Sequence, residues 1–244
     1  MLTSQNTLVI VPAFNEQESI FGVVQKVKQL GFNVLVVDDG SNDLTSHRAK
    51  AGGAQVLELS MNLGVGGALQ SGFNYAVQHD YEAIVQLDAD GQHPVNEIKN
   101  LIDKANTSDA DVVLASRFLN ENTEMDISQS RHFAMWILRV VASRACRTRI
   151  SDSSSGFRLI RKPLLSHFAK SFPSHYLGDT FEALVISGRK KYKVVEVSAP
   201  FKDRMYGQSS ATNKTAILLI FRALVVTSFG LHFQLPKKTE FRAD

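Results

Sequence analysis

The strongest constraint on the fold is a repeated alternation of short apolar runs and stretches with helical spacing. Strands are predicted at residues 8–11, 33–37, 55–59, 83–87 and 111–116, and a helix is expected to follow each of the first four. The first helix is the clearest, because Ile20, Val23, Val24 and Val27 fall on one face and Gly31 stands where a helix-ending glycine is expected. This alternation predicts an α/β fold: a mostly parallel, Rossmann-like sheet with helices on both faces.

Polar residues follow several of these strands. Asp38 and Asp39 end the second, Asp88 and Asp90 follow the fourth, and Arg117 follows the fifth. In a parallel sheet, ligands bind beyond the carboxyl ends of the strands. We therefore expect the charged side chains to gather at one edge, which is the candidate functional site.

The stretch Asp88-Ala89-Asp90 is the most informative of these strand ends. In an extended chain, residues two apart face the same way, so both carboxylates could point into one cleft. Two adjacent negative charges favour a divalent cation, and Mg²⁺ or Mn²⁺ prefers oxygen ligands, to which Gln92 could add a carbonyl. The alternative is a solvated Asp-Gly turn. His93, next to this stretch, is expected to be a structural histidine.

Other common sites are not favoured. Gly64, Gly66 and Gly67 precede a helix but lack the third glycine of a dinucleotide fingerprint, and no Gly-Lys-Ser/Thr of a phosphate-binding loop occurs. The net charge of +3 is too small to indicate nucleic acid. The single cysteine, Cys146, excludes an internal disulfide and fits a reducing compartment.

A basic stretch follows the fifth strand. Between residues 127 and 151 there are five arginines and no acidic residue (Arg131, Arg139, Arg144, Arg147 and Arg149). We expect a helix whose surface binds phosphates or anionic lipid, or else an ordinary solvated face. Met135 and Trp136 are expected to belong to the core.

Seven motifs taken together, in this order, resemble family 2 glycosyltransferases over residues 7 to about 210. They are VPAFNE (11–16), VVDDGSNDLT (36–45), NLGVGGAL (62–69), QLDADGQHP (86–94), ASRF (115–118), DSSSGFR (152–158) and DRMYGQSS (203–210). Within that family the chain looks most like the polyprenyl-phosphate branch, which is similar to dolichol-phosphate mannose synthase. Phe14 stands where many relatives have Tyr, and Ser210 where many have Lys.

The resemblance implies a GT-A fold and an inverting, metal-dependent transfer from a nucleotide-diphosphate sugar. It implies roles for four groups of residues. The donor would be bound by Pro12, Phe14, Glu16, Asp38, Asp39, Asp88, Ala89 and Ser209. Mg²⁺ or Mn²⁺ would be held by Asp88, Asp90 and Gln92. The acceptor phosphate would meet Arg117 and Arg131, and the catalytic group would comprise Asp90, Arg117, Arg204, Asp179 and Glu182.

The acceptor is left open between two chemistries. A polyprenyl phosphate is already ionised near neutral pH, so it needs a positively charged binding site and no general base. A saccharide hydroxyl in glycan or surface-polymer assembly needs a general base, for which Asp179 or Glu182 is available; both could instead be helix-start residues favoured by the helix dipole. A third hypothesis is a non-catalytic nucleotide-sugar-binding subunit.

The C-terminal part is expected to be an appendage to the catalytic domain. Residues 1–210 form the predicted GT-A domain, and residues 211–244 a tail that contains a 19-residue apolar stretch, 215–233, with Arg222 near its middle. We expect an interfacial or partner-packing helix there; a membrane span and a core helix are the alternatives. The expected location is the cytoplasmic face of a membrane, with a homo-oligomer or a membrane partner protein possible and no nucleic acid.

Overall fold

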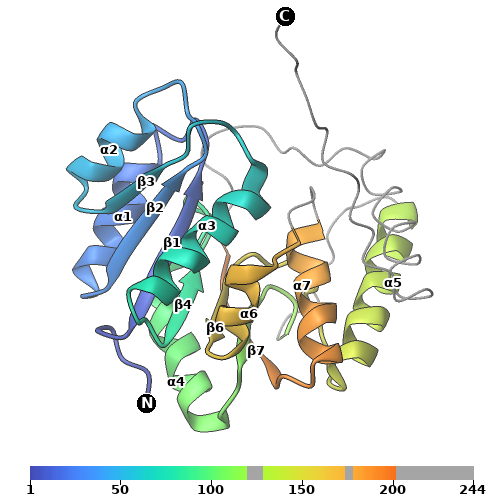
Figure 1. Ribbon diagram of the computed structural model, residues 1–244. Coiled ribbons are helices and arrows are strands. Elements are labelled where there is room, and N and C mark those ends of the chain that lie inside the picture. Colours follow the sequence, from blue (N-terminus) through green and yellow to red (C-terminus); the bar gives the residue numbers. More distant parts are fainter. Residues whose placement is uncertain (120–128, 174–177, 202–244) are drawn as a thin grey trace, which may run out of the picture.

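A computed structural model describes residues 1–119, 129–173 and 178–201 of the chain. In this part, seven strands form one sheet in the order β3-β2-β1-β4-β6-β5-β7 (Figure 1). All neighbours pair in parallel except β6, which runs antiparallel to both β4 and β5. The strands are β1 (Thr7–Ala13), β2 (Asn33–Asp38), β3 (Gln55–Glu58), β4 (Ala83–Gln86), β5 (Val112–Ser116), β6 (Arg158–Arg161) and β7 (Val194–Ser198).

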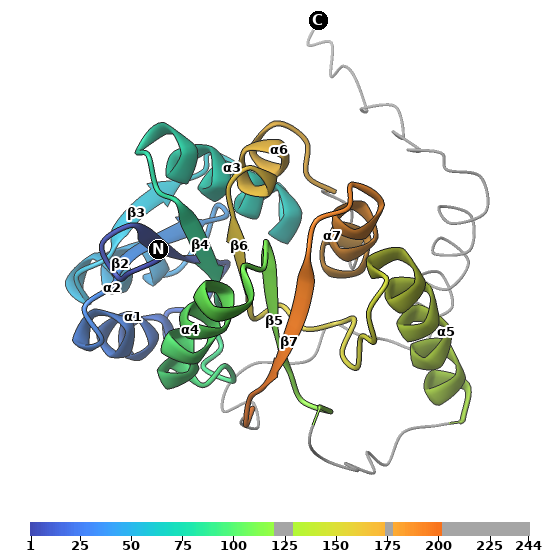
Figure 2. The ribbon, with the colours of Figure 1, turned by 90° about the horizontal axis from the view of Figure 1, so that it is seen from below.

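Helices cover both faces of the sheet because its central strands are apolar on both sides. On β1, Val9 and Val11 face the core formed with α1 and α4, whereas Leu8 and Ile10 face the core formed with α3 and α6. Figure 2 shows these helices on opposite faces. The helices are α1 (Ile20–Gln29), α2 (Thr45–Ala51), α3 (Gly64–Gln78), the short 3₁₀ helix η1 (Val95–Glu97), α4 (Ile98–Ser108), α5 (Gln129–Cys146), α6 (Leu164–Lys170) and α7 (Gly178–Arg189).

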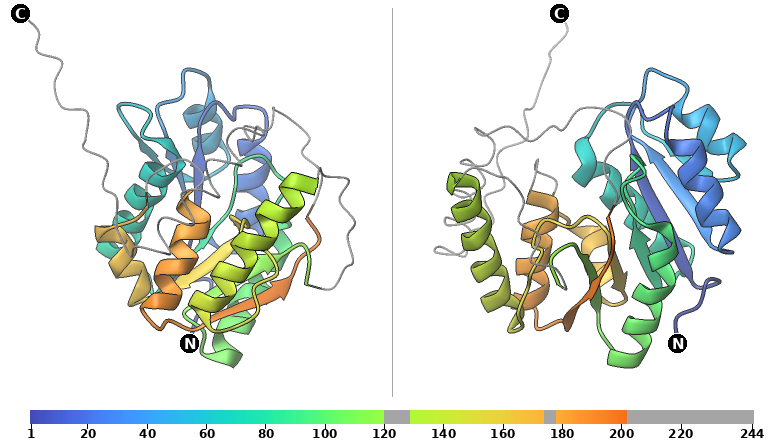
Figure 3. Two further views of the ribbon diagram at one scale, coloured as in Figure 1. Left: turned by 90° about the vertical axis from the view of Figure 1, so that its right-hand side faces the viewer. Right: turned by 180° about the vertical axis from the view of Figure 1, so that it is seen from behind.

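The arginine-rich helix α5 packs against α7 on the side of the molecule away from α1 and α2 (Figure 3, left). Ala142 of α5 and Leu184 of α7 are buried in the same core cluster. The Cys146 thiol donates to the carbonyl of Leu184 at 3.4 Å. The side of the sheet that carries β5, β6 and β7 is thus built from segments far apart in sequence.

The structure confirms the predicted α/β fold and each of the predicted strands, with small changes at their ends. The second helix begins later than Ser41 or Asn42, the first residues after β2 that could cap a helix. It begins at Thr45, where Asp43 Oδ1 accepts a hydrogen bond from the Thr45 backbone N–H at 2.9 Å.

Two elements and one side chain differ from expectation. The antiparallel strand β6 and helix α6 were not predicted, because β6 has the sequence Arg-Leu-Ile-Arg, which shows neither strand alternation nor a long apolar run. Trp136, expected in the core, is 57% exposed on α5. Within the described residues, no helix has the length and hydropathy of a membrane span; the predicted apolar segment 215–233 lies outside them.

Candidate functional site

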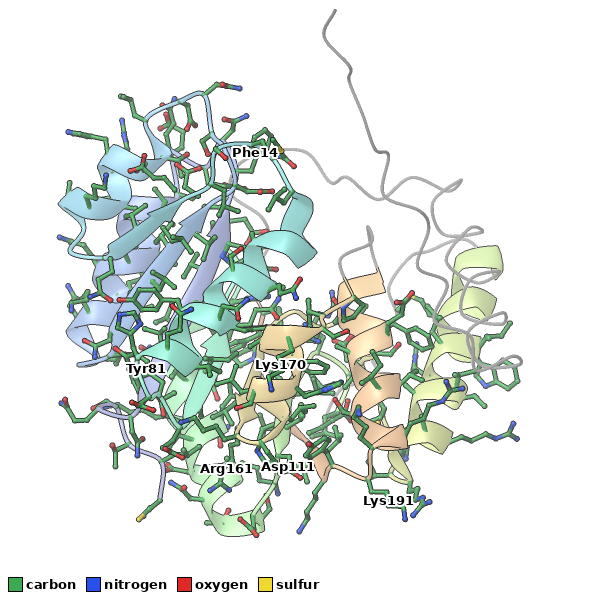
Figure 4. All side chains as sticks on the ribbon, in the orientation of Figure 1. Phe14, Tyr81, Asp111, Arg161, Lys170 and Lys191 are labelled. Atoms are coloured by element: carbon green, nitrogen blue, oxygen red, sulfur yellow. The ribbon has the colours of Figure 1, made fainter. Side chains whose placement is uncertain are left out.

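The predicted site residues that follow β1, β2, β4 and β5 lie at the edge of the sheet where these strands end. Figure 4 shows Phe14 at this edge, whereas Tyr81, Asp111, Arg161 and Lys191 lie toward the opposite edge. Phe14 directly follows β1, Asp39 follows β2, Asp88 is the second residue after β4 and Arg117 follows β5. The parallel arrangement of these four strands therefore places the donor-side and acceptor-side candidates on one rim, as the sequence predicted.

The loop after β1 is fastened to the loop after β2. The backbone N–H of Asn15 donates to Ser41 Oγ at 2.9 Å, and that of Glu16 donates to Thr45 Oγ1 at 2.8 Å. Pro12 lies in β1 and is half-buried, whereas Phe14 is 44% exposed. The two loops thus hold a rigid backbone from which the Phe14 ring projects.

Asp38 and Asp39 both turn inward at the end of β2. Asp38 Oδ1 accepts the Ser41 N–H at 2.9 Å, and Asp39 Oδ1 accepts the Leu63 N–H at 2.7 Å, at the start of α3. Burial raises the pKa of Asp39, an effect only partly opposed by hydrogen bonds from the Leu63 and Gly64 backbones and increased by the charge of Asp38. Asp39 therefore joins the loop after β3 to the proposed donor site.

The acidic pair after β4 differs from the expected extended geometry. The strand ends at Gln86, and residues 89 and 90 form a turn in which Gly91 has a φ of 76°. The Asp88 side chain is 43% exposed, whereas Asp90 is buried and its Oδ1 accepts the Gln92 N–H at 3.0 Å. The turn gives the two carboxylates different environments, so strand alternation does not explain their placement.

His93 fixes the conformation of Asp88. Its Nδ1 accepts the Asp88 backbone N–H at 3.0 Å, and its Nε2 lies 3.4 Å from Asp88 Oδ2. The ring is buried and stacks on Phe157 with a centroid separation of 5.2 Å. The expected structural histidine is therefore in direct contact with a predicted metal ligand.

Asp88 also abuts the segment before β6. A Cβ atom added to Gly156 would lie 3.3 Å from each carboxylate oxygen of Asp88 and 3.4 Å from Gln86 Nε2. In the same segment, the buried Ser155 Oγ has no hydrogen-bond partner among the described residues. A side chain at residue 156 would therefore crowd the Asp88 carboxylate, which would have to shift by a few tenths of an ångström.

Arg117 is held by Asp152 through a two-point ion pair. Its Nε and Nη2 donate to the two carboxylate oxygens at 2.7 and 2.9 Å, and Nη2 also donates to Ser154 Oγ at 2.8 Å. Burial alone would lower the pKa of Arg117, but the hydrogen bonds and charge of Asp152, with the charge of Asp88, raise it. Burial would likewise raise the pKa of Asp152, and Arg117 with Ser154 holds it below its ordinary value.

The oxygen donors Asp88, Asp90 and Gln92 fit a magnesium or manganese ion. No group of three His, Cys, Asp or Glu side chains suited to a metal occurs in the described part of the chain. Such a group is not required, because Mg²⁺ is usually bound by one or two carboxylates with substrate phosphates and water. The donor set and the partly exposed Asp88 are consistent with a site that the substrate completes.

Five further candidates are less fully described. Glu182 is half-buried on α7. Asp179 is the second residue of α7 and Arg131 lies in the first turn of α5, but both side chains are outside the described part of the structure. Arg204 and Ser209 lie wholly outside it. Their predicted roles remain predictions.

Sequence reasoning missed one buried cation near the site. Arg158 on β6 is 1% exposed, and its Nε donates to Gln86 Oε1 at 2.9 Å. Its Nη1 donates to the Thr180 carbonyl at 3.3 Å, in the first turn of α7. Arg158 thus connects the strand that precedes Asp88 with the helix that carries Asp179 and Glu182. Its only sequence signal is its place at the end of DSSSGFR.

Comparisons with known proteins agree with the predicted family and fold. The family model described as glycosyl transferase family 2 matches residues 8–168. A polyprenol monophosphomannose synthase from Mycolicibacterium smegmatis is 26% identical over 247 residues, covering 96% of this chain and 90% of the relative. An undecaprenyl-phosphate mannosyltransferase from Micrococcus luteus is 28% identical over 233 residues, covering 92% and 93%.

A solved structure shares the fold. Glucosyl-3-phosphoglycerate synthase from Mycobacterium tuberculosis, in complex with Mn²⁺, uridine diphosphate and phosphoglyceric acid, superposes with a TM-score of 0.69 at 19% identity. The match covers 90% of this chain and 77% of that one. It shows a GT-A-like α/β fold with a mostly parallel, mixed sheet.

Proposed function

This chain belongs to glycosyltransferase family 2, and we propose that it transfers a sugar from a nucleotide-diphosphate donor to a polyprenyl phosphate with inversion. The observation that carries the proposal is that Asp88, which follows β4, and Arg117, which follows β5, lie in one site. The partly exposed Asp88 abuts Gly156, and Arg117 is bound by Asp152 and Ser154 of the same short segment. An acidic group suited to a cation and a fixed guanidinium thus share one site.

On the donor side, the chain binds and orients the nucleotide. We assign the nucleoside to Pro12, Phe14, Glu16, Asp38 and Asp39, where two fastened loops present the Phe14 ring. Asp88, Asp90, Gln92 and the backbone at Ala89 would hold the cation and diphosphate. When bound, Mg²⁺ or Mn²⁺ supplies charge stabilisation to the departing diphosphate. Arg204 and Ser209 are assigned to the donor phosphates.

On the acceptor side, the chain has to bind an anion, the phosphate of the lipid. A lipid phosphate is ionised near neutral pH, so it can attack the anomeric carbon without a general base. Arg117, with Arg131 from α5, would neutralise the phosphate and aim its oxygen. This acceptor is supported by the relatives from M. smegmatis and M. luteus, whose names specify polyprenol and undecaprenyl phosphate chemistry.

The place of action follows from the acceptor. A polyprenyl phosphate is anchored in a bilayer, so the enzyme is proposed to work as a peripheral protein at the cytoplasmic face. The apolar segment 215–233 is proposed as the interfacial or partner-packing helix that holds it there. A second copy of this chain or a membrane protein is proposed as the partner in this docking.

The test is sugar transfer to a short-chain polyprenyl phosphate in detergent, with UDP-, GDP- and dTDP-sugars and either Mg²⁺ or Mn²⁺. We expect one donor class to give labelled lipid and EDTA to abolish it. Asp179→Asn and Glu182→Gln should each leave lipid transfer within about threefold, because no base is required. Transfer only to a saccharide hydroxyl, lost in one of these variants, would instead establish the hydroxyl-acceptor function. Saturable donor binding without turnover on either acceptor would indicate a binding subunit.

A further inference from the structure

We infer that the segment 152–156 is a positioning element that sets Arg117 against Asp88, with Asp152 holding the guanidinium and Glu196 holding the segment. The inference rests on the proposed function, because it concerns how the acceptor phosphate is received. None of the residues Asp152, Gly156 and Glu196 is assigned a contact with substrate. Each acts through Arg117 or Asp88.

The contact between Asp152 and Arg117 fixes the plane of the guanidinium. Two parallel hydrogen bonds from Nε and Nη2 define both its direction and its rotation, which a single contact would not do. The Asp152 side chain is 1% exposed, whereas that of Arg117 is 35% exposed. The carboxylate is therefore anchored in the protein, while the guanidinium keeps one side, at Nη1, without a hydrogen-bond partner among the described residues.

Glu196 in turn holds the start of the segment. Its carboxylate accepts the backbone N–H groups of Ser151 at 2.9 Å and Asp152 at 3.1 Å, and the Ser151 hydroxyl at 2.8 Å. Ser151 Oγ also lies 2.6 Å from Ser116 Oγ, next to Arg117. Because β7 pairs with β5, Glu196 comes from the strand beside the one that ends just before Arg117.

The end of the segment is fixed on Asp88. The Ala115 backbone N–H donates to the Phe157 carbonyl at 2.9 Å, which fastens the residue after Gly156 to β5. Gly156 itself abuts both oxygens of Asp88. The same short segment therefore contacts Arg117 at one end and Asp88 at the other, so it sets the spacing between the acceptor cation and the candidate metal carboxylate.

A double-mutant cycle tests whether Asp152 acts through Arg117. We expect Asp152→Asn to lower kcat/KM for polyprenyl phosphate about tenfold and to leave KM for the donor unchanged, because the released arginine must be ordered again on binding. In an Arg117→Ala background, Asp152→Asn should change kcat/KM by less than about twofold. Equal losses in both backgrounds would overturn the inference, since they would indicate a structural role. A lower acceptor KM in Asp152→Asn would overturn it too, because Asp152 would then only mask the charge of Arg117.

A second readout does not depend on activity. The Nε–H of Arg117, assigned by its loss in Arg117→Ala, should give a slowly exchanging NMR signal in the wild-type protein. The signal should be lost in Asp152→Asn and weakened in Glu196→Gln, a milder variant that keeps the segment's length and shape. An unchanged signal in both variants would overturn the positioning role. If the wild-type protein transfers no sugar but the signal behaves as expected, the proposed function fails and the positioning contact stands.

Discussion

Asp38, Asp88 and Asp90, at the ends of β2 and β4, are held differently from Arg117 at the end of β5. Asp38 binds the backbone of Ser41, Asp90 that of Gln92, and the backbone of Asp88 binds His93, all within five residues along the chain. Arg117 is held by Asp152, 35 residues away. Glu196 in turn holds that segment, because its carboxylate accepts the backbone N–H of Asp152, which lies 44 residues earlier in the chain.

This difference separates the proposed donor side, where Asp38, Asp88 and Asp90 make contacts within their own loops, from the proposed acceptor side, where Arg117 is held by a distant segment. The donor loops are also fastened to one another, Asn15 to Ser41 and Asp39 to Leu63, but these bonds join the neighbouring loops after β1, β2 and β3. The acceptor side forms only when β5, the segment 152–156 and β7 have all come together. Substitutions on the donor side should therefore change chemistry and spare stability, whereas those around β5, α5 and α7 should change both.

Removing the Asp88 carboxylate should have the largest effect on activity. We expect Asp88→Ala to lower kcat about 100-fold or more, because a group that stabilises the departing diphosphate is lost. Its melting temperature should stay within about 2 °C of wild type, because the side chain is 43% exposed. Asp103→Ala, which removes an exposed carboxylate on α4, is the matched control. Full activity of Asp88→Ala would contradict the assignment of Asp88 to the cation and diphosphate of the donor.

The second largest effect concerns the thiol at the α5–α7 contact. Burial, with the charge of Glu196, raises the pKa of Cys146 to about 11 from 9.0, against an opposing hydrogen bond from the Gly188 backbone. At pH 8 the thiolate should thus be about 100-fold rarer than in the unfolded chain, and alkylation by iodoacetamide correspondingly slower. The raised pKa contributes stability that is present below about pH 9 and is lost as the pH rises toward 11. Equal alkylation rates in buffer and in urea would contradict this packing.

Packing between α5 and α7 can be tested more directly at Gly188. A methyl group there would overlap the backbone of Ala145 and Cys146. We expect Gly188→Ala to lower the free energy of unfolding by about 1–3 kcal/mol and to speed alkylation of Cys146. The matched control is Gly22→Ala on the exposed face of α1, where the added methyl meets nothing within 4 Å. That change should stabilise the protein by about 0.5–1 kcal/mol. Similar melting temperatures for Gly188→Ala and Gly22→Ala would contradict the expected difference in stability between the two sites.

The donor side of the fold could be predicted from the sequence because its signals are local. Apolar runs identify the strands, and a parallel sheet brings Phe14, Asp39, Asp88 and Arg117 to one edge whatever the details of the loops. The sequence predicts the turn at Gly91 only as the alternative, an Asp-Gly turn, because strand alternation assumes that the chain stays extended beyond Gln86.

The acceptor side could not be predicted in the same way, because its signals lie in pairs distant along the chain. Nothing near Arg117 indicates that Asp152 will bind it, or that Glu196 will hold the segment. Arg158 is a similar case: a charged residue suggests a surface, yet it is buried beside Gln86. Such partners emerge only when β6 inserts between β4 and β5.

The smallest effect is expected at Gly156, where the two sides meet. In Gly156→Ala the new methyl would lie 3.3 Å from the Asp88 oxygens, closer than an ordinary contact, so the carboxylate should shift by a few tenths of an ångström. We expect about a tenfold weaker apparent affinity for Mn²⁺ in the presence of donor, because metal ligation is sensitive to displacements of this size. Acceptor KM at saturating metal should change by less than about twofold, since Asp152 and Arg117 are untouched. The measurement is initial rate against Mn²⁺ concentration, with Gly22→Ala, where the added methyl meets nothing within 4 Å, as a control for adding a methyl group. If acceptor KM rose as much as the metal requirement, the segment would move as one rigid unit, and the donor and acceptor sides would not be separable.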